Sequence, residues 1–481
     1  MIKQENIDRI ISDVSIRDVA IDEGITFSKE RGEKLWACCP FHNENTPSFF
    51  VDTGTNTWKC YAGCHSGGNV ISLYRKLKND LPFPIACKEL AKKYLNEDIE
   101  DDYKPSKEDE EKQKEKESLQ IILSYAQEFY VQCIHEVNPA ANKARETVRK
   151  RWGADAIERF GIGYAPRDGF IEWAMRKGLD FDLLEQVGLI GIGERGKYAM
   201  LRDRYTIPIY DKMSNVIGFT ARTMSDDKDI CKYLNLKNSL VYAKDKSVFG
   251  INFAQKEARL KNKFYLVEGA PDVVKLQSLE ILNTVASLGG AWTENQLKQL
   301  YHISHTVTFI PDADTLKPGN EWPAGTANVF ANGREALAAG FTVNVREIPI
   351  DYPAPKKEDP DSWIVDKAHF QQMKEEEFIY WFCRRRYWPT ADDIEQMTTE
   401  DRLKAIADIC SLLMMIRDED LRTSYLTGLC TMYKHSREWK DTLKRAKESE
   451  LSAKQEKERK GDIKMLREFG FTEHDNSYWG T

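Results

Sequence analysis

Residues 264–272 read FYLVEGAPD, and residues 307–314 read VTFIPDAD. Each stretch begins with a short apolar run, which predicts a buried strand, and each run is followed by carboxylates. Glu268 follows the first run, and Asp312 and Asp314 follow the second. The carboxyl ends of the strands of an α/β sheet are where such a fold places its chemistry. Carboxylates gathered there suit Mg²⁺ held against phosphate oxygens.

The surrounding sequence predicts the sheet itself. From residue 263 to about residue 350, apolar strands alternate with helical stretches, as in a βαβ layer. Asp272 falls one turn into the helix predicted after Glu268. It is either a metal ligand, a group that holds a water molecule, or a charge that stabilises the helix N-terminus. Asp359 and Asp361 are either outer-shell or second-metal ligands of magnesium, or a turn-forming Asp-Pro-Asp.

A second group of chemically distinctive residues lies near the N-terminus. Cys39 and His42 have two residues between them, and Cys60 and Cys64 follow further along with three residues between them. Two pairs of soft ligands on tight turns predict one tetrahedral zinc site. This zinc is expected to be structural, because four protein ligands leave no open position for a substrate.

The spacer between the two pairs predicts how they meet. SFFVDTGTNTWKC at 48–60 alternates apolar and polar residues and breaks at Gly54, which predicts a β-hairpin. Cys38 and His65 each stand next to a predicted ligand, so either is an alternative to its neighbour. The aromatic residues of this ribbon are candidates to stack on single-stranded bases or to pack in the core.

Composition narrows the class of protein. The 481 residues have room for roughly three domains of about 150 residues each. A hydrophobic content of 41% and a charged content of 31% indicate globular domains with solvated segments. The sequence contains no apolar run of membrane-spanning length and no signal peptide, so a cytoplasmic location is expected. In that location the ten cysteines are expected to be metal ligands or reduced core residues. The net charge of −7 argues against nonspecific coating of nucleic acid, although it leaves room for a local basic groove.

The zinc-module sequence carries a resemblance to a known family. CPFHNENTPSFFV at 39–51 and WKCYAGCHSGGNVISL at 58–73 resemble the N-terminal zinc domain of DnaG-type bacterial and phage primases. In that family the zinc domain helps to select the template site. The family usually has two residues where this chain has three between Cys60 and Cys64, and the resemblance favours Cys64 over His65 as the fourth ligand.

The rest of the chain continues this resemblance. ERFGIGYAP at 158–166 is similar to the start of the family's polymerase core, and RDRYTIPIYDKMSNVIGFTAR at 202–222, followed by CKYLN and YAKDKSVFG, is similar to its basic block. VEGAPDVV and FIPDAD look like its Toprim metal-binding core, with SLGGAWTENQL between them. KKEDPDSW at 356–363 resembles the last acidic motif. The motifs stand in the family's order over roughly residues 1–370.

One insertion departs from the family pattern. TLKPGNEWP at 315–323 stands between Asp314 and the Ala324-Gly325 pair that opens the next predicted helix. The family usually has only a short turn there. The inserted loop is expected beside the metal site, where it either alters access to the site or is a tolerated surface insertion.

The resemblance implies roles for specific residues. Glu268, Asp312 and Asp314 are expected to hold Mg²⁺ or Mn²⁺ for nucleotidyl transfer. A triphosphate and a template backbone need cations, and the basic block offers them, although a solvated surface position is the alternative for each. The residues expected to bind substrate and template are Arg202, Arg204, Arg222, Lys232, Asn235 and Lys244.

The expected activity is that of a DNA primase, which makes short RNA primers on single-stranded DNA. The expected partners are the single-stranded template, nucleoside triphosphates, the RNA–DNA hybrid product and a replicative helicase, and no membrane is expected. The alternatives are a noncatalytic zinc and Toprim DNA-binding recombination mediator, and a Toprim nuclease or topoisomerase. The full acidic set and the order of the motifs favour the primase.

The expected fold is a multidomain α+β protein with a zinc ribbon, a mixed α/β core that contains a Toprim βαβ subdomain, and a helical C-terminal region. That last region either contacts a partner such as a helicase or forms a bundle that stabilises the core, and it contains no GxxxxGK[ST] phosphate loop. The expected segments are a zinc-binding domain at 1–98, a charged linker at 99–118, the first part of the core at 119–258, the Toprim subdomain at 259–375 and the helical region at 376–481.

Overall fold

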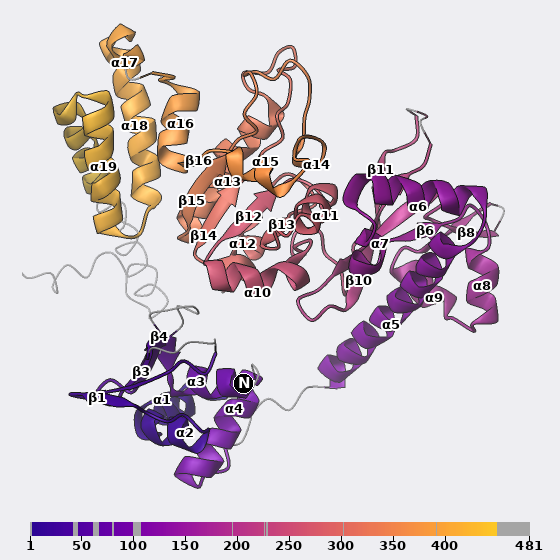
Figure 1. Cartoon of the computed structure of the whole chain (residues 1–481), viewed down its shortest axis with the longest axis horizontal. Helices are drawn as coiled ribbons and strands as arrows, with labels where there is room; N and C mark the ends of the chain where they lie inside the picture. The colour runs from indigo at the N-terminus through magenta and orange to yellow at the C-terminus, as the bar shows by residue number, and fades with distance from the viewer. Residues whose placement is uncertain are drawn as a thin grey trace, which may run out of the picture. The chain divides into compact units, whose positions relative to one another are not determined.

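The computed structural model divides into two compact units (Figure 1). Unit 1 comprises Met1–Ile121 and Arg259–Lys261, and unit 2 comprises Ile122–Ala258 and Asn262–Thr481. The five expected segments are finer than this division, and their boundaries stay predictions. The structure describes residues 2–41, 47–60, 67–78, 81–99, 107–194, 196–225, 227, 229–301, 303–390 and 392–449. Within these residues no helix has both the length and the apolar character needed to cross a bilayer.

Unit 1 is built on an antiparallel sheet of five strands in the order β1-β2-β3-β4-β5. Its strands are β1 (Lys29–Arg31), β2 (Lys34–Ala37), β3 (Phe49–Asp52), β4 (Thr57–Cys60) and β5 (Gly67–Asn69). The unit's helical elements before α5 are α1 (Gln4–Asp13), α2 (Ile16–Asp22), α3 (Val70–Leu77), α4 (Phe83–Leu90) and the π-helical turn η1 (Ala91–Leu95).

The hairpin predicted for residues 48–60 is confirmed, because β3 and β4 pair antiparallel with Phe49 opposite Cys60. Asp52 Oδ1 accepts hydrogen bonds from the backbone N–H groups of Gly54 and Thr55, which forms the turn. Asn56 has a φ of 53°, in the left-handed region that asparagine tolerates. Its amide donates to the carbonyls of Ile11 and Val14 and so fixes the hairpin against the α1–α2 corner.

The long helix α5 (Lys107–His135) begins inside the charged segment 99–118, so the later part of that segment is a solvated helix start. Unit 2 then forms a sheet in the order β11-β10-β9-β6. Its strands are β6 (Gly163–Ala165), β9 (Arg204–Tyr210), β10 (Val216–Thr223) and β11 (Tyr233–Asn235). The accompanying elements are α6 (Pro139–Trp152), α7 (Ala156–Phe160), α8 (Phe170–Arg176), α9 (Phe181–Gln186) and the hairpin of β7 (Ile190–Gly193) and β8 (Gly196–Ala199).

The predicted βαβ layer is confirmed as a second sheet of unit 2, with strand order β13-β12-β14-β15-β16. Its first four strands are parallel and β16 is antiparallel. The strands are β12 (Phe264–Val267), β13 (Thr284–Ala286), β14 (Thr306–Phe309), β15 (Thr342–Arg346) and β16 (Glu375–Glu377). The helices connected to them are α10 (Ile251–Lys261), α11 (Ala270–Ser278), α12 (Glu294–Tyr301), α13 (Ala324–Ala339), α14 (Pro360–Trp363) and α15 (Lys367–Gln372).

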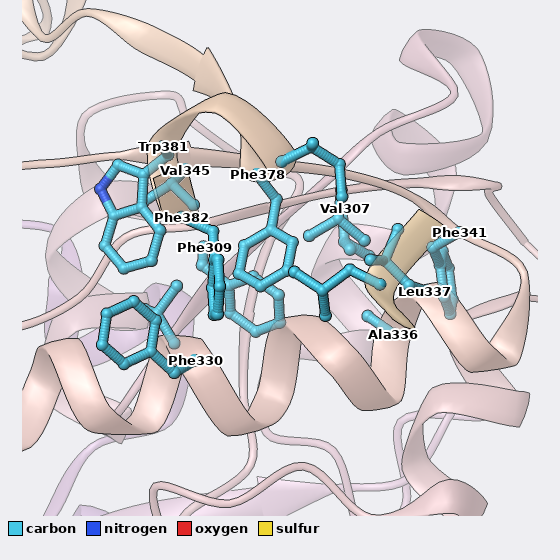
Figure 2. Packing of buried hydrophobic residues seen from close by; sticks show 14 of the residues in the cluster. Val307, Phe309, Phe330, Ala336, Leu337, Phe341, Val345, Phe378, Trp381 and Phe382 are labelled. Atoms are coloured by element: carbon cyan, nitrogen blue, oxygen red, sulfur yellow. The ribbon is translucent and has the colours of Figure 1, made fainter. Parts of the chain in front are cut away.

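The described part of the predicted C-terminal helical region, up to residue 449, consists mainly of helices and shares a hydrophobic core with this second sheet. Its elements are α16 (Phe378–Arg386), α17 (Asp393–Gln396), α18 (Thr399–Met415), α19 (Glu419–Tyr433) and a helix over 436–449. Figure 2 shows Phe378, Trp381 and Phe382 from α16 meeting side chains of β14, β15 and α13 in one cluster. Because β16 leads directly into α16, the helical region continues from the edge of the sheet.

Candidate active site

Three carboxylates stand at the carboxyl edge of two neighbouring parallel strands. Glu268 follows β12, and Asp312 and Asp314 follow β14. The two strands pair with Leu266 opposite Phe309, so their ends lie at the same edge of the sheet. The side chains of Asp312 and Asp314 are only 10% and 13% exposed. The structure therefore brings together the three residues that the sequence singled out.

The start of α13 holds these carboxylates in place. The backbone N–H of Gly325 donates to Asp314 Oδ2 at 2.9 Å, and Asn328 Nδ2 donates to Glu268 Oε1 at 3.3 Å. A Cβ atom at position 325 would collide with the backbone carbonyl of Asp312, so this approach requires glycine. The inserted loop 315–323 thus ends where the helix resumes its contact with the acidic cluster.

Burial and mutual repulsion disfavour the charged forms of these carboxyl groups. Burial, and after it the nearby charge of Glu268, raise the pKa of Asp312 to about 7, and the hydrogen bond from Lys357 opposes both effects. Burial also raises the pKa of Glu268, against a hydrogen bond from Asn328. Asp312 Oδ1 is buried and has no hydrogen-bond partner in the described part of the chain. These carboxylates are the hard oxygen donors that Mg²⁺ prefers, and one buried oxygen among them is unsatisfied, so the chemistry of the donor set suits Mg²⁺.

A lysine lies between the two aspartates. Lys357 Nζ donates to Asp312 Oδ2 at 2.8 Å and to Asp314 Oδ1 at 2.6 Å. Among the residues that the structure describes, no three His, Cys, Asp or Glu side chains converge in an arrangement that could hold a metal ion. Glu268, Asp312 and Asp314 are close together, but the ammonium group fills the space between the two aspartates.

Asp272 and Asp359 have structural contacts that the sequence left open. Asp272 is 5% exposed, and its two carboxylate oxygens accept backbone hydrogen bonds from Gly269 and Asp361. Asp272 therefore caps the start of α11 by accepting from the backbone N–H of the N-cap residue Gly269, which favours the helix-terminal role among its alternatives. Asp359 is the N-cap of α14 and accepts from the backbone N–H of Ser362 at 2.7 Å. Both residues also line the cleft beside the acidic cluster.

Asp361 forms an ion pair, and its role as an outer-shell or second-metal ligand stays a prediction. Arg151 donates to Asp361 Oδ2 from Nε at 2.6 Å and also approaches it with Nη2. Trp152 Nε1 donates to Asp361 Oδ1 at 2.6 Å. Both carboxylate oxygens are engaged, and the side chain is 5% exposed. Coordination of a metal by Asp361 would break these contacts, and we do not carry it into the proposed metal set.

A cleft of about 260 Å³ runs between the acidic cluster and the β9–β11 sheet. Lys232 and Asn235 line it, as the sequence predicted for substrate-binding residues, together with Glu268 and Asp312. Lys244 lies against Gly289, which also lines the cleft, and a Cβ atom at position 289 would come within 2.9 Å of Lys244 Cε. The glycine therefore leaves room for this lysine beside the cleft.

The three arginines of the basic block do not line this cleft. Arg202 is exposed and its guanidinium lies 5.3 Å from the ring centre of Tyr198, whereas Arg222 lies 5.6 Å from that of Tyr233. Neither belongs to the cleft lining. Arg204 is only 7% exposed, and its Nη1 donates to the backbone carbonyls of Ala221 and Lys232.

The contacts of Arg204 favour a structural role, and its role in binding substrate stays a prediction. Its hydrogen bonds reach the carbonyl of Ala221 in β10 and that of Lys232, which directly precedes β11. They therefore join β9 to both segments. Burial lowers the pKa of its guanidinium, as expected for a cation held inside the protein. A side chain so placed stabilises the sheet.

Two predicted zinc ligands can be placed. Cys39 and Cys60 are buried in unit 1, at 6% and 0% exposure, and Ser48 Oγ lies 3.3 Å from Cys60 Sγ. His42 and Cys64 lie outside the described residues, as does the alternative ligand His65. Cys38, the alternative to Cys39, is exposed. The zinc ligand set therefore stays a prediction.

Sequence reasoning missed Arg151, Asn328 and Lys357. Arg151 lines the cleft and lies in the last turn of α6. Three consecutive basic residues at the end of that helix were the available signal. Lys357 lies inside the acidic motif KKEDPDSW, whose pattern of carboxylates predicts metal ligands and gives no role for a lysine. Asn328 gives no signal in the sequence, because only packing brings it to Glu268.

Family models match two parts of the chain. Residues 2–107 match the CHC2 zinc finger, and residues 130–255 match the N-terminal domain of the DNA primase catalytic core. The DNA primase of Pseudomonas putida is 33% identical over 377 residues, which cover 76% of this chain and 53% of that protein. The chain thus spans about half the length of the curated relatives that it matches.

Solved structures give the same result. The crystal structure of the zinc-binding and RNA polymerase domains of the Aquifex aeolicus primase has a TM-score of 0.53 and 26% identity, covering 89% of this chain and 97% of that one. A DnaG primase catalytic domain bound to single-stranded DNA has a TM-score of 0.54 and 25% identity, covering 66% of this chain and 96% of that one. With its CHC2 zinc finger and its DnaG catalytic core, the chain belongs to the family of DnaG-type primases.

Proposed function

We propose that this chain is a cytoplasmic DNA primase that synthesises short RNA primers on single-stranded DNA. The observation that carries the proposal is the cluster of Glu268, Asp312 and Asp314 at the edge of two parallel strands, facing a cleft that Lys232 lines. The similar proteins named DNA primase support this activity, and a similar catalytic domain bound to single-stranded DNA supports the template. One structural zinc is proposed for unit 1, in keeping with its match to a zinc finger.

The metal set of the proposed reaction is Glu268, Asp312 and Asp314. Bound Mg²⁺ would supply activation of the attacking 3′-hydroxyl and neutralise charge on the transferred phosphate and the leaving pyrophosphate. The protein's part is to hold the three carboxylates at fixed positions. Gly325 and Asn328 do so through the hydrogen bonds that α13 donates to Asp314 and Glu268.

The opposite wall of the cleft is suited to a nucleoside triphosphate. Lys232 offers a cation for phosphate oxygens, and Asn235 offers an amide that donates and accepts hydrogen bonds. The turn Leu288–Gly290 lines the same cleft, with Leu288 at a φ of 61° and Gly290 at 76°. Strained backbone held beside a cleft is characteristic of ligand-binding turns. Lys244, packed against Gly289, adds a second positive charge near this turn.

The C-terminal helices support a stabilising role more directly than a partner-binding one. Their aromatic residues are buried against the sheet that carries the acidic cluster. A replicative helicase remains a proposed partner of the whole protein, but primer synthesis on bare single-stranded DNA does not depend on it in this proposal.

Primer synthesis tests the proposed function. Zinc-loaded protein is incubated with mixed-sequence single-stranded DNA, Mg²⁺ and labelled ribonucleoside triphosphates, and the products are resolved on a denaturing gel. The expected result is short products that disappear in the Asp312→Asn/Asp314→Asn double variant. Asp168→Asn, an exposed carboxylate of the same unit, serves as the matched control and is expected to leave the products unchanged.

Two results would contradict the proposal. One is an absence of products from folded, zinc-loaded wild-type protein. The other is undiminished synthesis in the double variant, because the two aspartates would then not belong to the catalytic site. Cleavage of the DNA without primer synthesis would favour the nuclease alternative.

A further inference from the structure

The position of Lys357 beside the two aspartates is set by backbone pairing of the neighbouring residue Glu358. Ala313 and Glu358 form an isolated antiparallel bridge, in which each backbone N–H donates to the other's carbonyl at 2.9 and 3.0 Å. In such a bridge the flanking residues also face one another, so Lys357 stands opposite Asp314. The segment that carries the lysine is therefore attached directly to the segment that carries the two aspartates.

The alternation of side chains along this bridge separates two neighbouring lysines. Successive side chains of an extended segment point to opposite faces. Lys356 and Glu358 share one face, where Lys356 Nζ donates to Glu358 Oε1 at 3.1 Å. Lys357 points to the other face, which is also the face of Asp312 and Asp314. The chain thus contains a lysine inside the acidic cluster and a matched lysine outside it.

Lys357 contacts one oxygen of each aspartate, while Asp312 Oδ1 is left without a partner among the described residues. Asp314 Oδ2 accepts a hydrogen bond from the backbone N–H of Gly325, and Asp314 Oδ1 accepts one from Lys357. Asp312 Oδ2 also accepts a hydrogen bond from Lys357. The ammonium group is therefore the cation shared by both aspartates, and it holds the place where a divalent ion would bridge them.

We propose that Lys357 is a built-in counter-ion of the Asp312–Asp314 pair, which a divalent metal ion must displace in order to bind. This inference rests on the proposed metal site and adds a residue that sets its affinity. The ammonium compensates the repulsion between the buried carboxylates before metal arrives, and so stabilises the acidic cluster. The same contacts oppose metal binding, because an ion that bridges the aspartates must first break two charge-assisted hydrogen bonds.

The side chain has room to leave. Lys357 is 55% exposed, whereas the aspartates that it contacts are almost buried. A flexible side chain with its stem in solvent can turn away without movement of the bridge that anchors its backbone. Exchange of the ammonium for a metal ion therefore requires only a change of rotamer at one residue.

Binding of Mn²⁺ tests the inference without reliance on activity. Zinc-loaded full-length protein is titrated with Mn²⁺, and the free ion is followed by electron paramagnetic resonance. Lys357→Met keeps the length of the side chain and removes its charge. We expect this variant to bind Mn²⁺ about tenfold or more tightly than the wild type, because the lost hydrogen bonds to charged groups no longer compete. Lys356→Met, the matched control on the other face, is expected to keep the wild-type affinity.

Thermal unfolding without divalent ions gives an independent readout. Lys357→Met is expected to melt at a lower temperature than the wild type in the absence of divalent ions. Added Mn²⁺ is expected to raise the melting temperature of this variant by more than it raises that of the wild type. Lys357→Gln serves as a second neutral variant if the methionine variant does not fold, and the same shifts are expected of it.

The outcomes separate this inference from the proposed function. Wild-type protein that binds Mn²⁺ while both neutral variants bind it equally well or more weakly would overturn the role of Lys357 and leave the metal site standing. Equal tightening in Lys356→Met would also overturn it, since general loss of positive charge would then be the cause. No Mn²⁺ bound by the wild type or the variants at millimolar concentration would overturn the metal site, and the inference with it.

Discussion

Arg151 Nη2 lies 2.6 Å from Asp361 Oδ2, although the two residues are 210 positions apart in the sequence. The arginine ends α6 and the aspartate stands in α14, so this ion pair joins the helix before the β9–β11 sheet to the segment that follows the acidic cluster. Arg151 Nη1 also donates to the hydroxyls of Tyr205 and Tyr233. The pair thus helps to fix the wall of the cleft that Arg151 lines.

The first prediction concerns this pair. Asp361→Asn keeps the shape of the side chain but leaves Arg151 without its counter-charge in a largely buried site. Breaking a buried ion pair in this way typically costs about 3–5 kcal/mol, so the free energy of unfolding of unit 2 is expected to fall by that order. Urea denaturation followed by tryptophan fluorescence measures it. Arg149→Met, which changes an exposed arginine of the same helix, is the control, and an equal effect of both substitutions would contradict the prediction.

The second prediction concerns pH. The folded protein holds the pKa of Asp312 at about 7, above the ordinary value of 3.8 for an aspartate, so between these pH values the folded state binds more protons than the unfolded state. The contribution of this group to stability is therefore present at low pH and is lost as the pH rises toward 7. Asp312→Asn removes this loss of stability with rising pH, because asparagine has no carboxyl group to titrate. Without divalent ions, the variant is expected to gain stability over the wild type as the pH rises from about 4 to 7, by at most about 4 kcal/mol, and the difference then levels off.

Urea denaturation of both proteins at pH 5, 6, 7 and 8 measures this difference. Saturating Mg²⁺ is expected to reduce or reverse it, because the metal stabilises only the protein with the intact carboxylate set. Asp168→Asn, at an exposed carboxylate, is expected to show no such trend. A pH-independent difference for Asp312→Asn would mean that Asp312 is ionised throughout this range.

The sequence predicted the acidic cluster because the necessary pattern is local. An apolar run followed by a carboxylate identifies one strand end, and parallel strands bring two such ends to one edge. Asp312 and Glu268 could therefore be assigned without knowledge of the tertiary structure. The hairpin at 48–60 was predictable for the same reason, since the alternation and the turn residues lie within one short segment.

The sequence could not show the contacts of side chains whose partners are distant in the sequence. Arg204 and Asp361 have the residue types of a binding site, but the first faces the backbone carbonyls of the neighbouring strand segments and the second faces Arg151. Sequence gives the charge of a side chain and not the direction in which it points. The position of Lys357 depends on the bridge between Ala313 and Glu358, a pairing between segments for which the sequence offered no signal.

The third prediction concerns zinc. Cys60 is buried at the end of β4, and the predicted site needs its thiolate, so Cys60→Ser is expected to abolish the single zinc bound per chain. Cys39→Ser is expected to do the same. Elemental analysis of protein purified in metal-free buffer measures the zinc content. Cys38→Ser tests the alternative ligand and is expected to retain zinc, as is Cys231→Ser at an exposed cysteine of unit 2. Zinc loss in Cys38→Ser with retention in Cys39→Ser would exchange the two assignments.

The packing of α16 on α13 depends on a glycine. Gly333 lies within α13, and a Cβ atom built there would collide with the ring of Phe378, which is fully buried. Figure 2 shows that ring among Val307, Leu337 and Phe382. The C-terminal helices therefore approach the sheet closely at a position where only glycine fits.

The fourth prediction tests this close approach by a double-mutant cycle. Alanine is favoured over glycine inside a helix by about 1 kcal/mol, yet Gly333→Ala is expected to destabilise the protein by about 1–3 kcal/mol because the new methyl group overpacks the core. In the Phe378→Leu background the same substitution is expected to be neutral or stabilising, since the smaller side chain makes room. The free energies of unfolding of all four proteins give the coupling. Stabilisation by Gly333→Ala in the wild-type background would show that α16 does not pack against α13 as this structure has it, and would reopen a separate, partner-binding role for the C-terminal helices.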